Sequence, residues 1–178
     1  GQRLKKLYLE SSAQGVGKSR RMAAESAHLA VPKIFDVERN AWKTTNLCES
    51  VLYISTELEL EEVQTMWLAY VSGVPEHKIL NGNYGPGEEQ RVDIAVELLE
   101  QANLYFVQIS NYDMDDIEQL IRKYYQIEHV NYVYYDYLST TIKIMSEGAS
   151  KSKISNLRED QILLMFTTRL KDLCNELD

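Results

Sequence analysis

Short runs of β-branched and aromatic residues alternate along this chain with longer segments whose apolar residues recur at helical spacing. The predicted strands are 6–10, 51–55, 104–110 and 130–138, and the predicted helices are 18–30, 60–71, 92–99, 117–124 and 163–177. Strands that alternate with helices of this length are typical of βαβ units, which build a mostly parallel sheet flanked by helices on both faces. Because 178 residues are the size of one domain, the sequence predicts a single α/β domain.

Two stretches between these elements give no clear periodicity. Residues 31–50 form a long connection of undefined structure, in which Phe35 and Trp42 are available to hold it against the body of the domain. Residues 81–89 contain a Gly-Pro-Gly core, which indicates a loop. Both stretches are therefore interpreted as connections between elements of the α/β fold.

Composition restricts the class of protein and its partners. The net charge is −8 and the pI is about 5.0, which argues against a broad basic surface for nucleic acid but leaves room for a small basic loop. No apolar run approaches the roughly 20 residues that span a bilayer, and the N-terminal segment lacks the apolar core of a secretory signal. A cytoplasmic protein without a membrane partner is expected. Cys48 and Cys174 lie far apart without metal-ligand spacing, which predicts two reduced thiols, with Cys174 on the apolar side of a helix.

The segment SAQGVGKSR, which begins at Ser12, has the features of a loop that binds phosphate through backbone N–H groups. Gly15 and Gly17 supply the backbone freedom. Lys18 supplies a charge for the outer phosphates and Ser19 a hydroxyl for magnesium. Ser12 replaces the glycine that usually opens this pattern. The alternative is a glycine-containing turn capped by Ser19, but the flanking predicted strand and helix favour a nucleotide site.

Two carboxylates follow predicted strands. Asp136 ends the strand NYVYYD, where a nucleoside triphosphatase holds the water shell of its metal. Glu57 lies just after the strand VLYIS, and in a parallel sheet both residues should meet Lys18 at the carboxyl ends of the strands. The alternatives are an aspartate that merely ends a strand and a glutamate that merely precedes a helix. Tyrosines alternate within the strand that ends at Asp136, which favours core packing over base stacking.

Four segments resemble the RecA-like motor domain of DnaB-type replicative hexameric helicases, including phage versions. They are GVGKS, VLYISTELE, VNYVYYDYLS and LREDQILLMFTTRLKDLCNEL, in the order and spacing of that family. The most specific elements are S-x-E after the predicted strand 51–55 and D-Y-L at the end of the predicted strand 130–138. The resemblance covers nearly the whole chain and implies a P-loop NTPase of RecA-like type over residues 1–178.

The resemblance implies a role for each matching residue. Lys18 and Glu57 would be catalytic, with Lys18 on the β- and γ-phosphates and Glu57 activating the attacking water. Ser19 and Asp136 would hold magnesium, Asp136 through water. The implied cofactors are Mg²⁺ and ATP. The residues expected to bind ATP are Gly15, Val16, Gly17, Lys18, Ser19 and Arg20.

Family members pull single-stranded DNA through a ring of six subunits, and one DNA-contacting loop follows the D-Y-L strand. The corresponding segment here is 139–156, with Lys143, Lys151 and Lys153 as the expected DNA contacts. The alternative is a surface loop without a role in DNA binding. The resemblance also implies a homo-hexamer, with a primase and a helicase loader as further partners.

This chain departs from the family pattern in three places. Family members usually carry Gln after D-Y-L, where this chain has Ser139 and Thr140. An arginine that is common in the helix after S-x-E is missing here, and Met66 and Trp67 lie near its place. The family continues past the last helix into a sensor strand, an arginine finger and a second DNA loop, so we expect a domain truncated at its C-terminal end.

The sequence therefore predicts the motor domain of an ATP-dependent DNA helicase. One alternative is another RecA-like ATPase, such as a recombinase or a clock-type switch protein. A second alternative is a catalytically idle nucleotide-binding module, such as a helicase loader.

Overall fold

The computed structural model describes residues 5–11, 13, 15–139, 141, 143–144 and 158–177. The chain forms two compact units. We call the first, Ser12–Gln108 with Val130–Asp136, the sheet unit. We call the second, Gly1–Ser11 with Ile109–His129 and Tyr137–Asp178, the helical unit. Among helices formed by described residues, none combines the length and apolar composition that crossing a bilayer requires.

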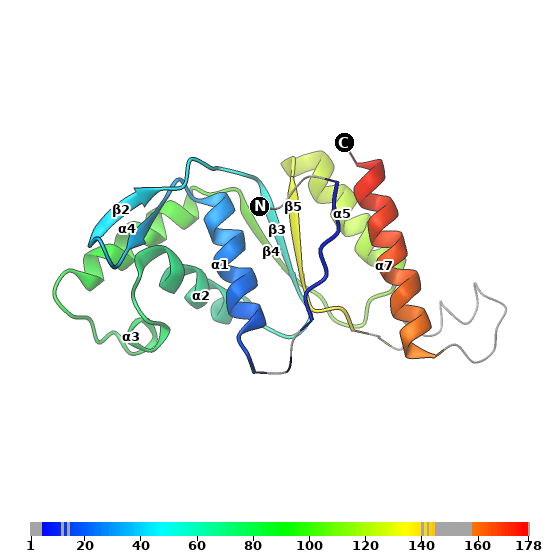
Figure 1. Ribbon diagram of the computed structural model, residues 1–178, viewed down its shortest axis with the longest axis horizontal. Coiled ribbons are helices and arrows are strands. Elements are labelled where there is room, and N and C mark those ends of the chain that lie inside the picture. Colours follow the sequence, from blue (N-terminus) through cyan, green and yellow to red (C-terminus); the bar gives the residue numbers. More distant parts are fainter. Residues whose placement is uncertain are drawn as a thin grey trace. The chain divides into compact units, whose positions relative to one another are not determined.

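The sheet unit contains a three-stranded parallel sheet, and the helices of the unit all lie on one side of it (Figure 1). Its order is β4 (Leu104–Gln108), β3 (Val51–Ser55) and β5 (Tyr132–Asp136). All five residues of β3 are buried, as expected for an apolar run inside a parallel sheet. The α/β class and three of the predicted strands are confirmed, with the strands predicted at 104–110 and 130–138 shorter than expected.

The strand predicted at 6–10 is wrong. These residues have no regular structure, and Tyr8 and Leu9 are 55% and 63% exposed. A strand requires a neighbour that accepts and donates its backbone hydrogen bonds. In the described part of the chain, backbone ladders join only β1 (Lys33–Asp36) with β2 (Ala41–Thr44) and β3 with β4 and β5. The segment KLYLE therefore has no strand to pair with, although its apolar residues alternate.

Three helices pack on one face of the sheet: α1 (Lys18–Ala30), α2 (Leu60–Ser72) and α4 (Glu88–Glu100). The small side chains of α1, among them Ala23 and Ala27, pack with Val51 and Tyr53 of β3 in the buried core. Trp67 of α2 joins the same core. The helix predicted at 18–30 has those bounds in the structure, because Gly17 precedes its first turn and Pro32 follows its end.

Residues 31–50, interpreted as an irregular connection, contain a β-hairpin. Its antiparallel strands are β1 (Lys33–Asp36) and β2 (Ala41–Thr44). Phe35 and Trp42 pair across it with ring centroids 5.5 Å apart in an edge-to-face arrangement, which stabilises the pair beyond simple burial. These two residues therefore hold the hairpin together. They also hold it against the body of the unit, as expected, because Trp42 packs against the buried core and the Arg91 guanidinium of α4 lies 4.2 Å from the Phe35 ring centroid.

The end of α2 requires a glycine. Gly73 caps the helix with φ 67°, a left-handed conformation that strains other residues. A Cβ at this position would lie 2.7 Å from Cγ2 of Val37 on the hairpin. A short helix that the sequence did not predict, α3 (Glu76–Asn81), follows and precedes the Gly-Pro-Gly loop.

The helical unit consists mainly of α5 (Met114–Glu128) and α7 (Glu159–Glu176). Arg169 of α7 donates hydrogen bonds to Asp115 at 2.6 Å and to Glu118 at 2.5 Å. Arg122 of α5 bonds Glu118 and reaches Glu176 of α7. Two shared arginines therefore join these helices through charge-assisted hydrogen bonds.

Candidate nucleotide-binding site

The turn before α1 has the backbone conformation that a phosphate loop needs. Gly15 and Gly17 have φ of 80° and 87°, and Gly17 is the N-cap of the helix. A Cβ at either glycine would meet no atom within 4 Å, so the backbone conformation rather than crowding requires glycine. The alternative in which Ser19 caps the helix does not describe this turn, because Ser19 lies inside the first turn of α1.

The first turn of α1 carries Lys18, Ser19 and Arg20 and no acidic residue. The backbone N–H groups of this turn and the positive end of the helix dipole therefore favour the binding of an anion. Lys18 and Ser19 are half-buried, while Val16 is exposed. Lys18 and Ser19, two of the residues expected to bind phosphate and magnesium, thus lie at the N-terminal end of α1.

Asp136 ends β5 almost fully buried, with 3% of its surface exposed. Its Oδ2 accepts a hydrogen bond from Oη of Tyr53 at 3.0 Å. Burial, with a further contribution from Asp136, raises the pKa of the Tyr53 hydroxyl well above its usual range, so the phenol stays protonated and donates. Tyr53 is a neighbour that sequence reasoning missed.

Glu57 lies on the turn that follows β3. This turn is fixed by Ser55, whose Oγ accepts from Leu58 N at 2.9 Å and donates to Leu58 O at 2.8 Å. Glu57 itself is exposed. The N-cap of α2 is Glu59, whose backbone N–H donates to Glu62 at 3.0 Å. Glu57 precedes this cap by two residues, so the alternative of a glutamate that merely precedes a helix stays open.

The register of the sheet brings the ends of β3 and β5 together. Ser55 is aligned with Asp136, and the backbone N–H of Thr56 donates to the carbonyl oxygen of Asp136 at 2.8 Å. Glu57 is therefore one residue from a direct backbone contact with the strand that carries Asp136. Both carboxylates lie at the carboxyl edge of the sheet, where parallel sheets bind ligands.

The same edge is close to the start of α1. Aligned residues of parallel strands share a face, so Asp136 lies on the face of β3 and β5 that also carries Val51 and Tyr53, against which α1 packs. Figure 1 shows the N-terminal end of α1 and the carboxyl ends of β3 and β5 toward the same end of the sheet. The fold thus gathers Lys18, Glu57 and Asp136 at one end of the sheet unit.

The residues expected to hold magnesium fit the chemistry of that ion. Mg²⁺ keeps several waters and is usually bound by one or two protein groups together with substrate phosphates. Within the described residues, no group of three or more His, Cys, Asp and Glu side chains forms a protein-only metal site. One oxygen of Asp136 accepts from Tyr53, and a carboxylate has further lone pairs with which to accept from metal-bound water.

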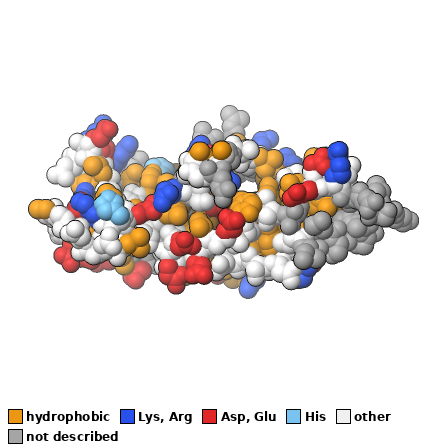
Figure 2. Space-filling view, turned by 90° about the horizontal axis from the view of Figure 1, so that it is seen from below, with side chains coloured by type: hydrophobic (Ala, Val, Ile, Leu, Met, Phe, Trp, Pro, Cys, Tyr) orange, Lys and Arg blue, Asp and Glu red, His pale blue; other side chains and the backbone are white. Residues whose placement is uncertain are grey.

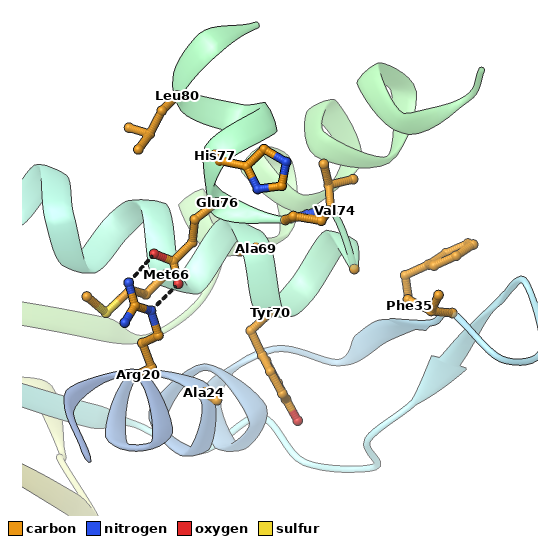
Figure 3. A pocket seen from close by; sticks show the side chains of 13 residues that line it. Arg20, Ala24, Phe35, Met66, Ala69, Tyr70, Val74, Glu76, His77 and Leu80 are labelled. Atoms are coloured by element: carbon orange, nitrogen blue, oxygen red, sulfur yellow. Dashed lines mark hydrogen bonds and ion pairs between the residues drawn. The ribbon is translucent and has the colours of Figure 1, made fainter. Parts of the chain in front are cut away.

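Arg20 has a partner that the sequence did not indicate. Its guanidinium donates two hydrogen bonds to Glu76 of α3, at 2.7 and 3.1 Å (Figure 3). The pair borders an open, mainly apolar groove between α1, the hairpin, α2 and α3. This pair uses two of the five N–H donors of the guanidinium, so the Arg20 side chain keeps donors for a phosphate without breaking the pair.

The expected DNA contacts lie largely outside the described residues, which include neither Lys151 nor Lys153. Lys143 is exposed and pairs with Asp116 at 3.5 Å. Ser139, one of the departures from the family pattern, lies 3.0 Å from the hydroxyl of Tyr112. Over the described residues of the face in Figure 2, basic side chains are scattered among acidic ones and form no continuous patch, in keeping with the net charge of −8.

Comparison with known proteins gives two findings. A family model of the DnaB-like helicase C terminal domain matches residues 5–178. The chain is also 40% identical over 178 residues to the SPbeta prophage-derived uncharacterized protein YorI of Bacillus subtilis (strain 168). That match covers 100% of this chain and 35% of YorI, so the chain spans about a third of the length of this curated relative.

Proposed function

The chain belongs to the family of DnaB-like helicase C-terminal domains, and we propose that it is the motor domain of an ATP-dependent replicative DNA helicase. In this role it couples ATP hydrolysis to translocation on single-stranded DNA and to duplex unwinding. The observation that carries the proposal is the arrangement at one end of the sheet unit. There the glycine turn before α1 and the carboxyl ends of β3 and β5 lie together.

We assign ATP to the turn and first helical turn over residues 15–20. Backbone N–H groups there cradle the phosphates, and Lys18 contacts the β- and γ-phosphates. Ser19 and Asp136 hold magnesium, which neutralises the charge that develops on the transferred phosphate. Glu57 accepts a proton from the attacking water as a general base. Its exposure on a fixed turn supports this role, because a general base must be reachable by water.

The helicase role includes the partners that the family resemblance implies. We propose a homo-hexamer around single-stranded DNA, with Lys143, Lys151 and Lys153 toward the strand. A few lysines from each subunit would then meet in one channel, so a basic surface on the single chain is not required. A primase and a helicase loader are the proposed protein partners, and the prophage-derived relative supports a phage or prophage origin.

The family match runs over residues 5–178 and so includes segments of both compact units. This supports our proposal that the two units belong to one RecA-like ATPase domain.

The test is ATP hydrolysis by the full-length protein, with and without single-stranded DNA. The proposal expects hydrolysis that DNA stimulates and that Lys18→Ala abolishes. Hydrolysis that is indifferent to DNA would indicate a switch-type RecA-like ATPase instead. Nucleotide binding without hydrolysis would indicate a loader-like module.

A further inference from the structure

A single polar atom of Tyr53 reaches the carboxylate at the candidate site from inside the core. Tyr53 lies in the middle of β3 and is 0% exposed. It is aligned with Tyr134, whereas Asp136 is aligned with Ser55. The 3.0 Å bond from Tyr53 Oη to Asp136 Oδ2 is therefore a diagonal contact between neighbouring strands, a distance that a long aromatic side chain can bridge.

The ring of Tyr53 is held by aromatic neighbours on several sides. It stacks on Phe106 of β4 and on Tyr134 of β5, with centroids 6.2 and 6.4 Å away. Trp67 of α2 packs against it edge to face at 6.0 Å. Packing of this kind leaves the ring little freedom, so the position of the hydroxyl, and with it the orientation of the Asp136 carboxylate, is fixed by the core.

This aromatic cluster is also connected to the helix that carries the phosphate loop. Nε1 of Trp67 donates to Oγ of Ser26 at 3.0 Å, and Ser26 in turn donates to the carbonyl oxygen of Ala23. Both serine and alanine lie on α1. A continuous set of contacts therefore runs from α1 through Trp67 and Tyr53 to Asp136.

The backbone of Asp136 is held from a different direction. Its carbonyl oxygen accepts from the N–H of Thr56 at 2.8 Å and from the hydroxyl of Thr56 at 3.4 Å. Thr56 directly precedes Glu57. The main chain of Asp136 is thus tied to the turn that carries the proposed general base, and its side chain is tied to Tyr53.

Packing alone does not explain the hydroxyl. A phenylalanine would fill the same space, and a hydroxyl buried among apolar rings is costly unless it is hydrogen-bonded. Its bond goes to the carboxylate that stands at the proposed metal site. We infer that Tyr53 is a positioning residue for the proposed ATPase reaction, orienting Asp136 so that its carboxylate can accept from the water shell of magnesium.

This inference rests on the proposed function, and Tyr53→Phe in the full-length protein tests it. Two measurements are made: the affinity of the protein–ADP complex for Mn²⁺ by electron paramagnetic resonance, and kcat and KM for ATP hydrolysis with Mg²⁺. We expect Mn²⁺ affinity and kcat to fall about tenfold, as for other residues that orient a metal-holding group. KM for ATP should change by less than about twofold, because the phosphate loop is intact.

Tyr134→Phe is the matched control. It removes the same atom from the ring that stacks on Tyr53, so it should leave Mn²⁺ affinity and kcat unchanged. Equal effects of the two variants would show that loss of a buried hydroxyl, rather than the bond to Asp136, is responsible, and would overturn the inference. Wild-type Mn²⁺ affinity and kcat in Tyr53→Phe would also overturn it.

Asp136→Asn separates this inference from the proposed function. If Asp136→Asn weakens Mn²⁺ binding and Tyr53→Phe does not, the inference fails and the metal role of Asp136 stands. If Asp136→Asn also binds Mn²⁺ normally, the metal role fails and the inference fails with it. Tyr53→Phe added to Asp136→Asn should produce no further loss, since the hydroxyl then acts through a carboxylate that is no longer present.

Discussion

Two carboxylates at one edge of the sheet lie in opposite surroundings. Asp136 ends β5 inside the core, with Tyr53 donating to its side chain. Glu57 lies two residues beyond β3 on an exposed turn, which Ser55 fixes through its hydroxyl. A group that holds the water of a metal benefits from a fixed orientation, whereas a group that takes a proton from water must be accessible. We propose that the same chemical group, a carboxylate, serves two functions at two adjacent strand ends because its surroundings differ.

The buried member of this comparison should give the largest effect. Asp136→Asn is expected to lower ATP hydrolysis on the order of a thousandfold, because charge stabilisation by a metal is worth several kcal/mol. Asparagine keeps an oxygen that accepts from Tyr53, so circular dichroism should show a folded protein. The measurement is steady-state hydrolysis by the full-length variant.

Asp93→Asn serves as its control, since Asp93 is an exposed aspartate on α4 in the same unit. It should hydrolyse ATP as the wild type does. Similar losses in the two variants would remove the special role assigned to Asp136.

Gly17, in the turn before α1, can be compared with Gly82, a glycine that also has a left-handed backbone conformation but lies after α3. Gly17 and Gly82 have φ of 87° and 62°, and a Cβ at either would meet no atom within 4 Å. Replacing each with alanine should cost about 1–2 kcal/mol of unfolding free energy, the penalty for a left-handed L-residue. Gly17→Ala should in addition weaken ATP binding about tenfold, or 1.4 kcal/mol, because it distorts the phosphate loop.

Thermal melting and titration with a fluorescent ATP analogue check this pair. If Gly82→Ala weakened nucleotide binding as much as Gly17→Ala, general destabilisation would account for both, and the turn before α1 would lose its assigned role.

The smallest effect is expected at the ion pair beside the phosphate loop. Glu76→Gln breaks the two bonds to Arg20, and because Arg20 is 64% exposed the loss in stability should stay below about 1 kcal/mol. Without these bonds the first turn of α1 is no longer attached to α3 through Arg20, which should raise KM for ATP by no more than about threefold. Glu25→Gln, which breaks the Arg21–Glu25 pair within α1, should leave KM unchanged. A tenfold rise in Glu76→Gln would place this pair in the nucleotide site.

The helices and strands that could be predicted from the sequence are those whose bounds are set by residues within or next to the element itself. The bounds of α1 follow from Gly17 and Pro32, and β3 follows from a run of five apolar or β-compatible residues that is buried throughout. The hairpin was missed because its strands are four residues long and only partly buried, so they lack a periodic pattern. The error at 6–10 has the opposite cause, since a local pattern cannot report whether a pairing strand is present.

At the site, the rule that parallel strands gather their carboxyl ends was sufficient to bring Glu57 and Asp136 to one edge. The bond between Tyr53 and Asp136 was not predictable, because it joins residues 83 positions apart and depends on the register between β3 and β5. The pairing of Arg20 with Glu76 likewise depends on the unpredicted helix α3. Side-chain contacts that require long-range register are thus beyond pattern reasoning.

The most direct test of the central claim, that the carboxyl edge of this sheet is an ATPase site, compares Glu57→Gln with Glu59→Gln in the full-length protein. Both residues are exposed glutamates on the segment between β3 and α2. ATP binding and single-turnover hydrolysis are measured for each. Our account predicts that Glu57→Gln binds ATP but hydrolyses it about a hundredfold or more slowly, the usual contribution of a general base, while Glu59→Gln hydrolyses it normally. Normal hydrolysis by Glu57→Gln would contradict the account.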